Sequence, residues 1–512
     1  MTRLALAIAI LASSPAFAAT RCDRILAAFG NRLADAVCFE SLDLTTNNPA
    51  TTPANNSIAG LAVGAFTPQT DRGVISPNPP NRTPIIRVVP GIQLDARVAD
   101  DPTGEARFVL RLPDDWNGRL VVAGASGTRS EFNGDFAWSD YVVQKGYAYA
   151  SQNKGVLNLF IVSLASPTPP EPLACRLNPA SQIWVHFFDN DPGHPFTDWA
   201  PRMVQAAALA RNGLEAHYGR SPRKTFAVGT SNGGYQVRRA VEMAPDLFDG
   251  GVDWEGTFVD AGAPNLLTDL PPAILNFPDY AASGLSANST AAKNIVAAGY
   301  PPDIVGPGNL SLWGLYNAQF WEVTQCQWQK RLDPTYDTYG SGTGTYNYVS
   351  RLSASNVGAN FAAFATTGRI RRPLVTVAGT MDGLLPIDHH ARAYARKVAA
   401  AQDKRDDTEE RVSPATGAGR SPEHTDADRD DERDGAPAYR LYEVQNGNHI
   451  ETFKDLFPQL ELLQPHAQRA FDLLVDHVER GAALPADQCI GRGSTIAQHP
   501  AKPGHCTSLF VP

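Results

Sequence analysis

Lys224-Thr-Phe-Ala-Val-Gly229-Thr-Ser231-Asn-Gly-Gly234 is the stretch that decides the fold, because it leads from a buried strand into a helix through a glycine-rich turn. The apolar run before Gly229 predicts the strand, and the segment 235–243 predicts the helix. A Gly-x-Ser-x-Gly turn in this position is typical of a nucleophile elbow, which holds a serine in a strained, exposed turn. The alternative is an ordinary glycine-rich turn. The flanking strand and helix favour Ser231 as a nucleophile.

The segments around this turn predict a layered α/β architecture. Strands are expected at 107–112, 119–123, 146–151, 373–378 and 438–444, and helices at 199–218, 388–402 and 465–480. Nearly continuous apolar strands that alternate with helices are typical of a mainly parallel sheet with helices on both faces. With the elbow, this pattern predicts the α/β-hydrolase fold.

Two long segments interrupt this scheme and divide the chain. We predict a signal peptide (1–18), an N-terminal extension (19–100), a first part of the catalytic core (101–256), a lid insertion (257–367) and a second part of the core (368–512) that carries a charged loop (401–437). Within the extension, residues from about 21 to 88 are rich in turn formers and are expected to be irregular, with few strands. The lid is rich in tryptophan and tyrosine, which suits a cap over an apolar pocket. The charged loop is poor in apolar residues and is expected at the surface.

The N-terminus predicts export. A charged start, the apolar run 4–12 and the small residues up to Ala18 have the pattern of a cleavable signal, and no later segment is apolar enough to span a bilayer. We therefore expect a soluble periplasmic or secreted protein. Its six cysteines then suit disulfides. Proximity in sequence suggests the pairs Cys22–Cys38 and Cys489–Cys506.

Charge and motif content argue against several other classes of function. Lys and Arg number 44 and Asp and Glu 53, a net charge of −9, and residues 403–434 alone contribute −6 from twelve acidic and six basic residues. The rest is close to balanced, so no basic patch indicates a nucleic-acid partner. No metal-binding spacing of cysteine or histidine occurs, so we predict neither a metal nor a cofactor. The sequence does not indicate an oligomeric state.

The order of the chain selects the partners of Ser231. In an α/β-hydrolase the acid follows a later strand than the nucleophile, and the histidine follows a strand after that. Asp382 lies directly beyond the strand 373–378, and His449 lies beyond the strand 438–444. Asp388 is the alternative acid, although its place before a helix suits an N-cap. The other ten histidines precede the nucleophile or lie in helices, the charged insertion or the C-terminal tail.

Two backbone amides are expected to bind the oxyanion of an acyl-transfer reaction. One is the amide of Asn232, the residue after the nucleophile. The other should come from the loop 124–128, which follows the strand 119–123, with Ser126 or Gly127 as the donor. Position alone supports this second assignment.

Candidate substrate contacts come from two places. Trp254 and Glu255 directly follow the strand expected near 250–253, which is the next strand after the elbow. Trp313 and Trp321 belong to the aromatic residues of the lid. Each could equally be a packing residue, because few side chains line a pocket.

Several stretches resemble the tannase and feruloyl-esterase-like hydrolases. These are the elbow Gly229-Thr-Ser-Asn-Gly-Gly-Tyr235, the following Pro245-Asp-Leu-Phe-Asp-Gly250, the strand Gly146-Tyr-Ala-Tyr-Ala-Ser-Gln-Asn-Lys-Gly155, the large insertion before Asp382 and Ala486-Asp-Gln-Cys489. The resemblance covers most of the chain from about residue 100 and implies a serine esterase. Members of the family carry cysteines beside the catalytic serine and histidine, joined by a disulfide, where this sequence has Thr230 and Ile450.

The predicted function is an exported serine carboxylic-ester hydrolase with a Ser-His-Asp triad and an acyl-enzyme intermediate. The predicted substrates are aryl, hydroxycinnamoyl or hydroxyalkanoate-type esters, small or oligomeric. The absent cysteines argue against tannin and feruloyl substrates and favour a divergent branch that acts on other esters, such as aryl esters or hydroxyalkanoate oligomers. A serine peptidase of the prolyl-oligopeptidase type is the alternative enzyme, because such proteins also carry Ser-Asn-Gly-Gly at the elbow. However, the chain before residue 100 has no room for their β-propeller. A non-catalytic hydrolase-fold binding protein is the other alternative.

Overall fold

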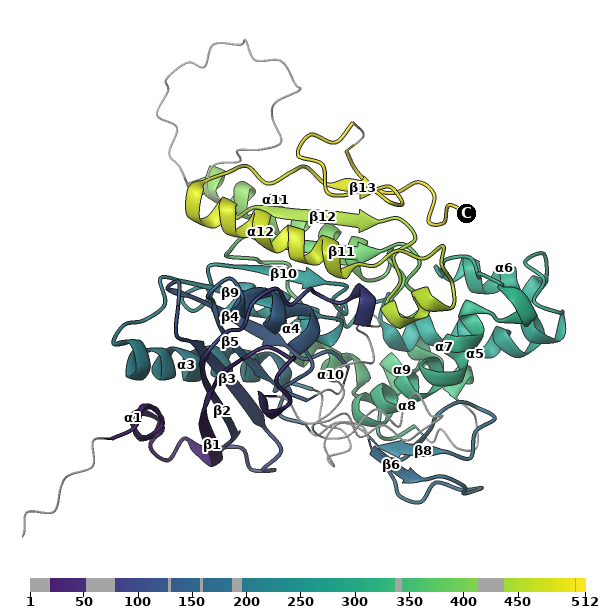
Figure 1. Cartoon of the computed structure of the whole chain (residues 1–512). Helices are drawn as coiled ribbons and strands as arrows, with labels where there is room; N and C mark the ends of the chain where they lie inside the picture. The colour runs from purple at the N-terminus through teal and green to yellow at the C-terminus, as the bar shows by residue number, and fades with distance from the viewer. Residues whose placement is uncertain are drawn as a thin grey trace, which may run out of the picture.

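The computed structural model describes residues 19–51, 79–127, 130–156, 160–186, 196–336, 343–412, 437–501 and 503–512. The predicted signal peptide, 1–18, lies outside these residues, as does most of the charged loop, 413–436. Figure 1 draws the whole chain.

A large twisted sheet forms the centre of the molecule (Figure 1). Its strands lie in the order β1 (Leu33–Ser41), β2 (Gly91–Val98), β3 (Arg107–Pro113), β5 (Ala148–Gln152), β4 (Arg119–Gly124), β9 (Lys224–Thr230), β10 (Gly250–Trp254), β11 (Leu374–Gly379), β12 (Tyr439–Val444) and β13 (Gln488–Ile490). Neighbours from β5 to β13 pair in parallel. The pairs β1–β2, β2–β3 and β3–β5 are antiparallel. The carboxyl ends of the parallel strands therefore share one edge.

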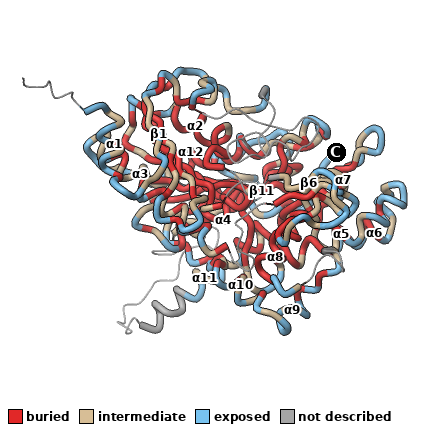
Figure 2. The backbone as a smooth tube through the Cα atoms, turned by 90° about the horizontal axis from the view of Figure 1, so that it is seen from below, coloured by how far each residue is buried: buried red, intermediate tan, exposed pale blue. Residues whose placement is uncertain are grey.

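Helices cover both faces of this sheet. The helices α1 (Arg21–Phe29), α3 (Trp199–Tyr218), α4 (Asn232–Met243) and α11 (Ala391–Val412) pack with one set of strand side chains, and α2 (Asp140–Val143) and α12 (Gln464–Arg480) pack with the other. Within β9, Ala227 belongs to the first core and Phe226 and Val228 to the second, as the alternation of a strand requires. Figure 2 shows the buried residues gathered along the sheet. The predicted α/β-hydrolase fold is confirmed.

The N-terminal part is more regular than the sequence suggested. The strands β1 and β2 pair with each other, and β2 continues the main sheet through β3. The strand β1 thus lies inside the segment 21–88, which we had expected to be irregular with few strands, and β2 lies just beyond that segment. Residues 91–98 carry the signal for β2, since Ile92, Leu94, Ala96 and Val98 alternate and are all buried.

The chain between β10 and β11 folds largely as helices: α5 (Leu266–Ala282), α6 (Thr290–Ala297), α7 (Leu312–Gln319), α8 (Trp321–Leu332), α9 (Tyr348–Ala354) and α10 (Val357–Phe364). They form a separate hydrophobic core with its own tryptophans and tyrosines. A small sheet of β6 (Phe160–Ser163), β8 (Trp184–His186) and β7 (Cys175–Arg176) contacts α8. The role of these helices as a lid stays a prediction.

All six cysteines are paired. Cys22–Cys38 and Cys489–Cys506 form the two short-range disulfides expected from proximity. The third, Cys175–Cys326, joins β7 to α8 across 151 residues. Among the described helices, none combines the length and apolar character that a bilayer crossing requires.

A buried carboxylate joins the inserted helices to the core. Asp269 on α5 lies 3.0 Å from Nδ1 of His389 and 3.3 Å from Nε2 of His390, in the turn before α11. Burial lowers the pKa of His389, but the paired Asp269 outweighs that effect, so the pKa is raised above its ordinary value. Burial raises the pKa of Asp269, but both histidines lower it, and the net shift is downward. Burial lowers the pKa of His390, and its Nδ1 accepts the Phe258 amide proton at 3.0 Å.

This contact predicts a pH-dependent contribution to stability. The raised pKa of His389 gives stability that is present below the ordinary value of 6.5 and is lost as the pH rises through the folded-state pKa. The lowered pKa of Asp269 gives stability that is present above 3.8 and is lost as the pH falls through the folded-state pKa. We expect Asp269→Asn to lower the melting temperature most between these limits and less as the pH rises above 6.5. Thermal melts across this range measure the difference. Asp279→Asn, on the exposed side of the same helix, is the control. If the melting temperatures of the two variants depended on pH in the same way, the pH-dependent stability could not come from the contact of Asp269 with the histidines.

Candidate active site

Ser231 lies in the sharp turn between β9 and α4. Its backbone has φ 59° and ψ −122°, a conformation that is strained for any residue except glycine. Its amide donates to the carbonyl of Trp254 at 2.9 Å, and its carbonyl accepts from the Thr257 amide at 3.2 Å. Both bonds fasten the turn to the chain that follows β10. The strain is held at the residue whose hydroxyl would react.

The glycines of the elbow are needed for space. A Cβ atom on Gly229 would lie 2.4 Å from the carbonyl oxygen of Gly233, and a Cβ on Gly233 would lie 2.5 Å from that of Gly124. Each obstacle is backbone and cannot swing aside. The turn therefore packs directly on the loop after β4, which explains why glycines flank the serine on both sides.

Asp382, His449 and Ser231 form one hydrogen-bonded chain. Nδ1 of His449 lies 2.7 Å from Oδ2 of Asp382, and Nε2 lies 3.1 Å from Oγ of Ser231. The other carboxylate oxygen of Asp382 accepts the backbone amides of Leu384 and Leu385 at 2.8 and 2.7 Å. Asp382 follows β11 and His449 follows β12, so the three residues meet at the carboxyl edge of the sheet.

Non-covalent contacts hold the three side chains in place. The amide of Met381, beside Asp382, donates to the carbonyl of Gly447 at 2.7 Å and so joins the aspartate loop to the histidine loop. Thr230 and Ile450, which occupy the places of the family's cysteines, are both buried. Tyr316 of α7 donates its hydroxyl to Oδ1 of Asn448 at 2.8 Å, so the inserted helices also support the histidine loop.

The structure separates the two candidates for the second oxyanion donor. The amide of Ser126 donates to Oδ1 of Asn133 at 3.0 Å, and its hydroxyl donates to the same oxygen at 2.9 Å. That amide is therefore engaged. The amides of Gly127 and Asn232 donate to no acceptor within the described residues. Asn232 also opens α4, so the positive end of a helix points at this place.

Two side chains that the sequence analysis did not single out, Lys154 and Gln236, hold the loop 124–127. The ammonium of Lys154 is buried and donates to the carbonyl of Ala125 at 2.9 Å. Gln236 of α4 accepts the Ala125 amide at 3.0 Å and the side-chain amide of Gln152 at 3.1 Å. The amide of the Asn232 side chain donates to the carbonyl of Gly127 at 3.3 Å. A lysine and a glutamine at buried positions were the available signal, but a sequence does not show burial.

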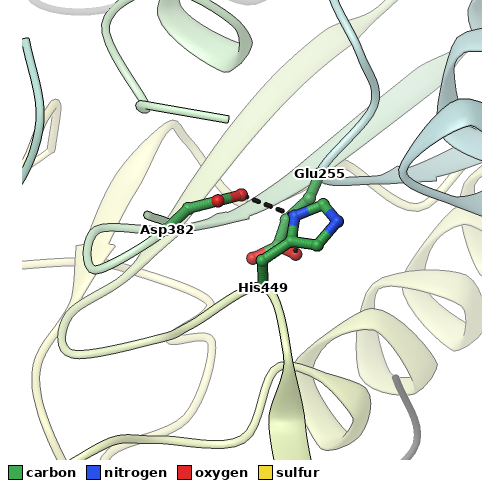
Figure 3. Close-up of side chains that lie close together, drawn as sticks. All are labelled: Glu255, Asp382 and His449. Carbon is green, nitrogen blue, oxygen red and sulfur yellow. Dashed lines mark hydrogen bonds and ion pairs between the residues drawn. The ribbon is translucent and has the colours of Figure 1, made fainter. Parts of the chain in front are cut away.

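Glu255 lies beside His449 (Figure 3). Its Oε2 is 3.3 Å from Nδ1 of His449, on the same side of the ring that meets Asp382. We had predicted Glu255 as a substrate contact. The structure places it behind the imidazole, since Nε2 of the ring faces Ser231.

The tryptophans proposed as substrate contacts are all packed. Trp254 lies in the core of the sheet, edge-on to Trp138. The indole nitrogen of Trp313 donates to the carbonyl of Pro301, and that of Trp321 donates to the carbonyl of Gly383. The exposed fractions of Trp254, Trp313 and Trp321 are 2, 1 and 0%. The buried positions of these tryptophans do not support a role in substrate binding, and that role stays a prediction.

The donor atoms of Glu255, Asp382 and His449 lie within 4.8 Å of one another, close enough to hold a metal ion. A metal on Nδ1 of His449 would require the ring proton to sit on Nε2. Nε2 could then not accept the proton of Ser231. The 2.7 Å contact between Nδ1 and a carboxylate oxygen of Asp382 suits a proton on Nδ1, which leaves Nε2 as the acceptor and favours an acid–base role for these side chains.

No protein-family model matches the chain. Residues of this chain are 27% identical over 139 positions to a D-(-)-3-hydroxybutyrate oligomer hydrolase from Burkholderia thailandensis, a match that spans 26% of this chain and 15% of that protein. The chain thus corresponds to only a small part of that relative.

Similar solved structures include two fungal enzymes. Feruloyl esterase B from Aspergillus oryzae is 13% identical with a TM-score of 0.43, and the match covers 88% of each chain. A tannin acyl hydrolase from Aspergillus niger is 13% identical with a TM-score of 0.44, and the match covers 91% of this chain and 87% of the other. These are the kinds of enzyme that the elbow motif resembles.

Proposed function

We propose that the protein is a serine carboxylic-ester hydrolase in which Ser231, His449 and Asp382 are the catalytic triad. The observation that carries this proposal is the hydrogen-bonded chain from Asp382 through His449 to Ser231, with distances of 2.7 and 3.1 Å, on a serine in a strained turn. A serine hydroxyl is a weak nucleophile until a neutral imidazole accepts its proton. His449 is that base, and its Nε2 lies within hydrogen-bond distance of the Ser231 hydroxyl.

In the acylation step, Oγ of Ser231 attacks the ester carbonyl while Nε2 of His449 takes the hydroxyl proton. Asp382 keeps the other ring proton on Nδ1 and stabilises the imidazolium. The carbonyl oxygen becomes an oxyanion, which the amides of Asn232 and Gly127 are placed to bind. Collapse of the tetrahedral intermediate releases the alcohol, which receives its proton from His449.

In the deacylation step, water attacks the acyl-serine and gives a proton to Nε2 of His449. The same two amides bind the second oxyanion, and the acid product leaves when Ser231 regains its proton. The glycine contacts fix the distance between the elbow and the loop 124–127, so both donors are in place before the reaction starts. Such preorganisation is the main source of rate enhancement in acyl transfer.

For the substrate, we propose an aryl, hydroxycinnamoyl or hydroxyalkanoate-type ester, small or oligomeric. The hydroxyalkanoate option is supported by the 139-residue similarity to a hydroxybutyrate oligomer hydrolase. Thr230 and Ile450, which stand where the tannase and feruloyl-esterase-like hydrolases carry cysteines, support a divergent branch of those hydrolases. We also propose that the protein works outside the cytoplasm, which the disulfides support.

Covalent labelling tests the nucleophile and an ester panel tests the reaction class. We expect a fluorophosphonate probe to modify the peptide that contains Ser231, and prior denaturation to abolish labelling. The panel consists of p-nitrophenyl butyrate, methyl ferulate, methyl gallate and a hydroxybutyrate dimer, beside prolyl and aminoacyl p-nitroanilides as amide substrates. Turnover of the amides alone would favour the peptidase alternative. A folded protein that neither labels nor turns over any substrate would favour a binding protein.

A further inference from the structure

The residue after β10 is unusual in conformation and in position. Glu255 has φ 51°, in the left-handed region, and 1% of its side-chain surface is exposed. This conformation is strained for a non-glycine residue, and residues in such conformations gather at functional sites. Its amide donates to the carbonyl of Val377 at 2.8 Å, so the strained turn is fixed to the neighbouring strand.

Two carboxyl groups converge on one ring nitrogen. Oδ2 of Asp382 lies 2.7 Å and Oε2 of Glu255 lies 3.3 Å from Nδ1 of His449 (Figure 3). Oε1 of Glu255 accepts the amide of Gly379 at 3.2 Å, while Oε2 has no hydrogen-bond partner among the described residues. The free oxygen is thus the one that faces the imidazole.

The surrounding chain leaves space for this side chain. A Cβ on Gly379 would lie 2.9 Å from Oε1 of Glu255 and 2.4 Å from the carbonyl oxygen of Gly447. The strand end at residue 379 therefore admits only glycine while Glu255 and the histidine loop keep these positions. Glu255, like Asp382 and His449, emerges at the carboxyl edge of the sheet.

The charges around Glu255 are mostly of its own sign. Burial raises the pKa of Glu255 well above its ordinary value, and the negative charges of Asp382, Glu451 and Asp253 raise it further, against the amide of Gly379. His449 lies in contact with Glu255 and carries a charge of opposite sign when its imidazole is protonated. Removal of the Asp382 charge takes away one of the causes that raise this pKa, so we expect the pKa of Glu255 to fall when Asp382 is replaced.

We propose that Glu255 is a positioning residue for His449, a second carboxyl group that supports the Nδ1 edge of the imidazole and replaces Asp382 as the acceptor of its proton when Asp382 is lost. This proposal rests on the proposed function, because it assigns Glu255 to the same histidine. When Asp382 is removed, the pKa of Glu255 falls, and the carboxylate forms by loss of the proton to solvent as the pH rises. Its Oε2 then accepts the hydrogen bond from Nδ1–H, and Nε2 remains free to take the proton of Ser231.

A double-mutant cycle tests the replacement, with hydrolysis of p-nitrophenyl butyrate as the readout. We expect Glu255→Gln alone to lower kcat by less than about tenfold, and to lower it by about 100-fold in the Asp382→Ala background. Asp382→Ala should stay above the activity of His449→Ala, and the double variant should fall to it. An equal factor for Glu255→Gln in both backgrounds would overturn the proposal.

A matched variant separates this role from a structural one. Glu242→Gln removes another buried glutamate, which bonds Tyr394 and Arg239 and not the histidine. We expect its effect on kcat to be the same with and without Asp382. We also expect Glu255→Gln to shift the pH profile of kcat/KM, which a purely structural effect would leave in place.

A spectroscopic measurement on Asp382→Ala holds even if Glu255→Gln does not fold. The proton on Nδ1 of His449 should give a downfield proton NMR signal in Asp382→Ala, and activity should rise with pH as Glu255 ionises. Absence of the signal, with activity equal to that of His449→Ala, would overturn the proposal. The proposed function fails by a different result, full activity of Ser231→Ala or of His449→Ala.

Discussion

Replacement of Ser231 by alanine is expected to lower kcat for any ester that the protein hydrolyses by at least about 10⁴-fold. The variant removes the oxygen that forms the acyl-enzyme and leaves the two amides near Asn232 and Gly127. Residual hydrolysis should come from these donors and from binding alone. Among the described residues, the Ser231 hydroxyl has one hydrogen bond, that with Nε2 of His449, and the substitution removes only this bond. The fold should therefore persist.

Initial rates and single-turnover assays measure this loss, together with melting curves that verify folding. Ser221→Ala is the matched control, because the Ser221 hydroxyl bonds Glu215 near the end of α3 and has no link to the triad. His449→Ala should cost about as much as Ser231→Ala, and the double variant little more, since members of a triad act as a unit. Strictly multiplicative losses would speak against a shared mechanism.

Asp253→Ala is expected to lower the free energy of unfolding by about 3–5 kcal/mol. Asp253 on β10 and Arg238 on α4 form an ion pair of 2.6 Å between Nε and Oδ2, and neither side chain is exposed. The terminal nitrogens of Arg238 have no hydrogen-bond partner among the described residues, and its guanidinium lies over the ring of Tyr394. Removal of the aspartate leaves a buried, unpaired cation.

Urea unfolding followed by fluorescence measures this change. Asp115→Ala is the matched control, since it also removes an aspartate from an arginine, here an exposed pair with Arg87 at 2.7 Å. Its cost should stay below about 1 kcal/mol. A second substitution, Arg238→Met in the Asp253→Ala background, should recover part of the stability, because a neutral side chain has no charge to bury. Equal costs for Asp253→Ala and Asp115→Ala would refute the argument.

The sequence was sufficient for features that depend on local pattern and chain order. The strand, glycine turn and helix around Ser231 follow from residues that are adjacent in the chain, and parallel strands must end at the same edge. That is why Asp382 and His449 could be paired with a serine more than 150 residues before the first of them. The fold class followed from the same alternation of strands and helices.

Features that depend on long-range packing could not be predicted in this way. The position of Glu255 depends on a left-handed turn and on the path of the histidine loop, neither of which its spacing reveals. Trp313 and Trp321 look alike in sequence whether they line a pocket or fill a core. Ser126 and Gly127 could be separated only after the side chain of Asn133 was seen to occupy the Ser126 amide.

The longest cross-link has a consequence for how the protein must be made. Cys175–Cys326 encloses a stretch of chain that contains both Ser231 and Glu255, and it ties β7 to α8. Since Cys326 is synthesised well after the elbow, this bond closes only when β10 and the first inserted helices already exist. A reducing compartment would deny the inserted helices their covalent attachment to the strand β7, while the two short-range disulfides lie at other places. Recombinant production therefore calls for an oxidising host compartment, where α8 is fastened as the chain matures.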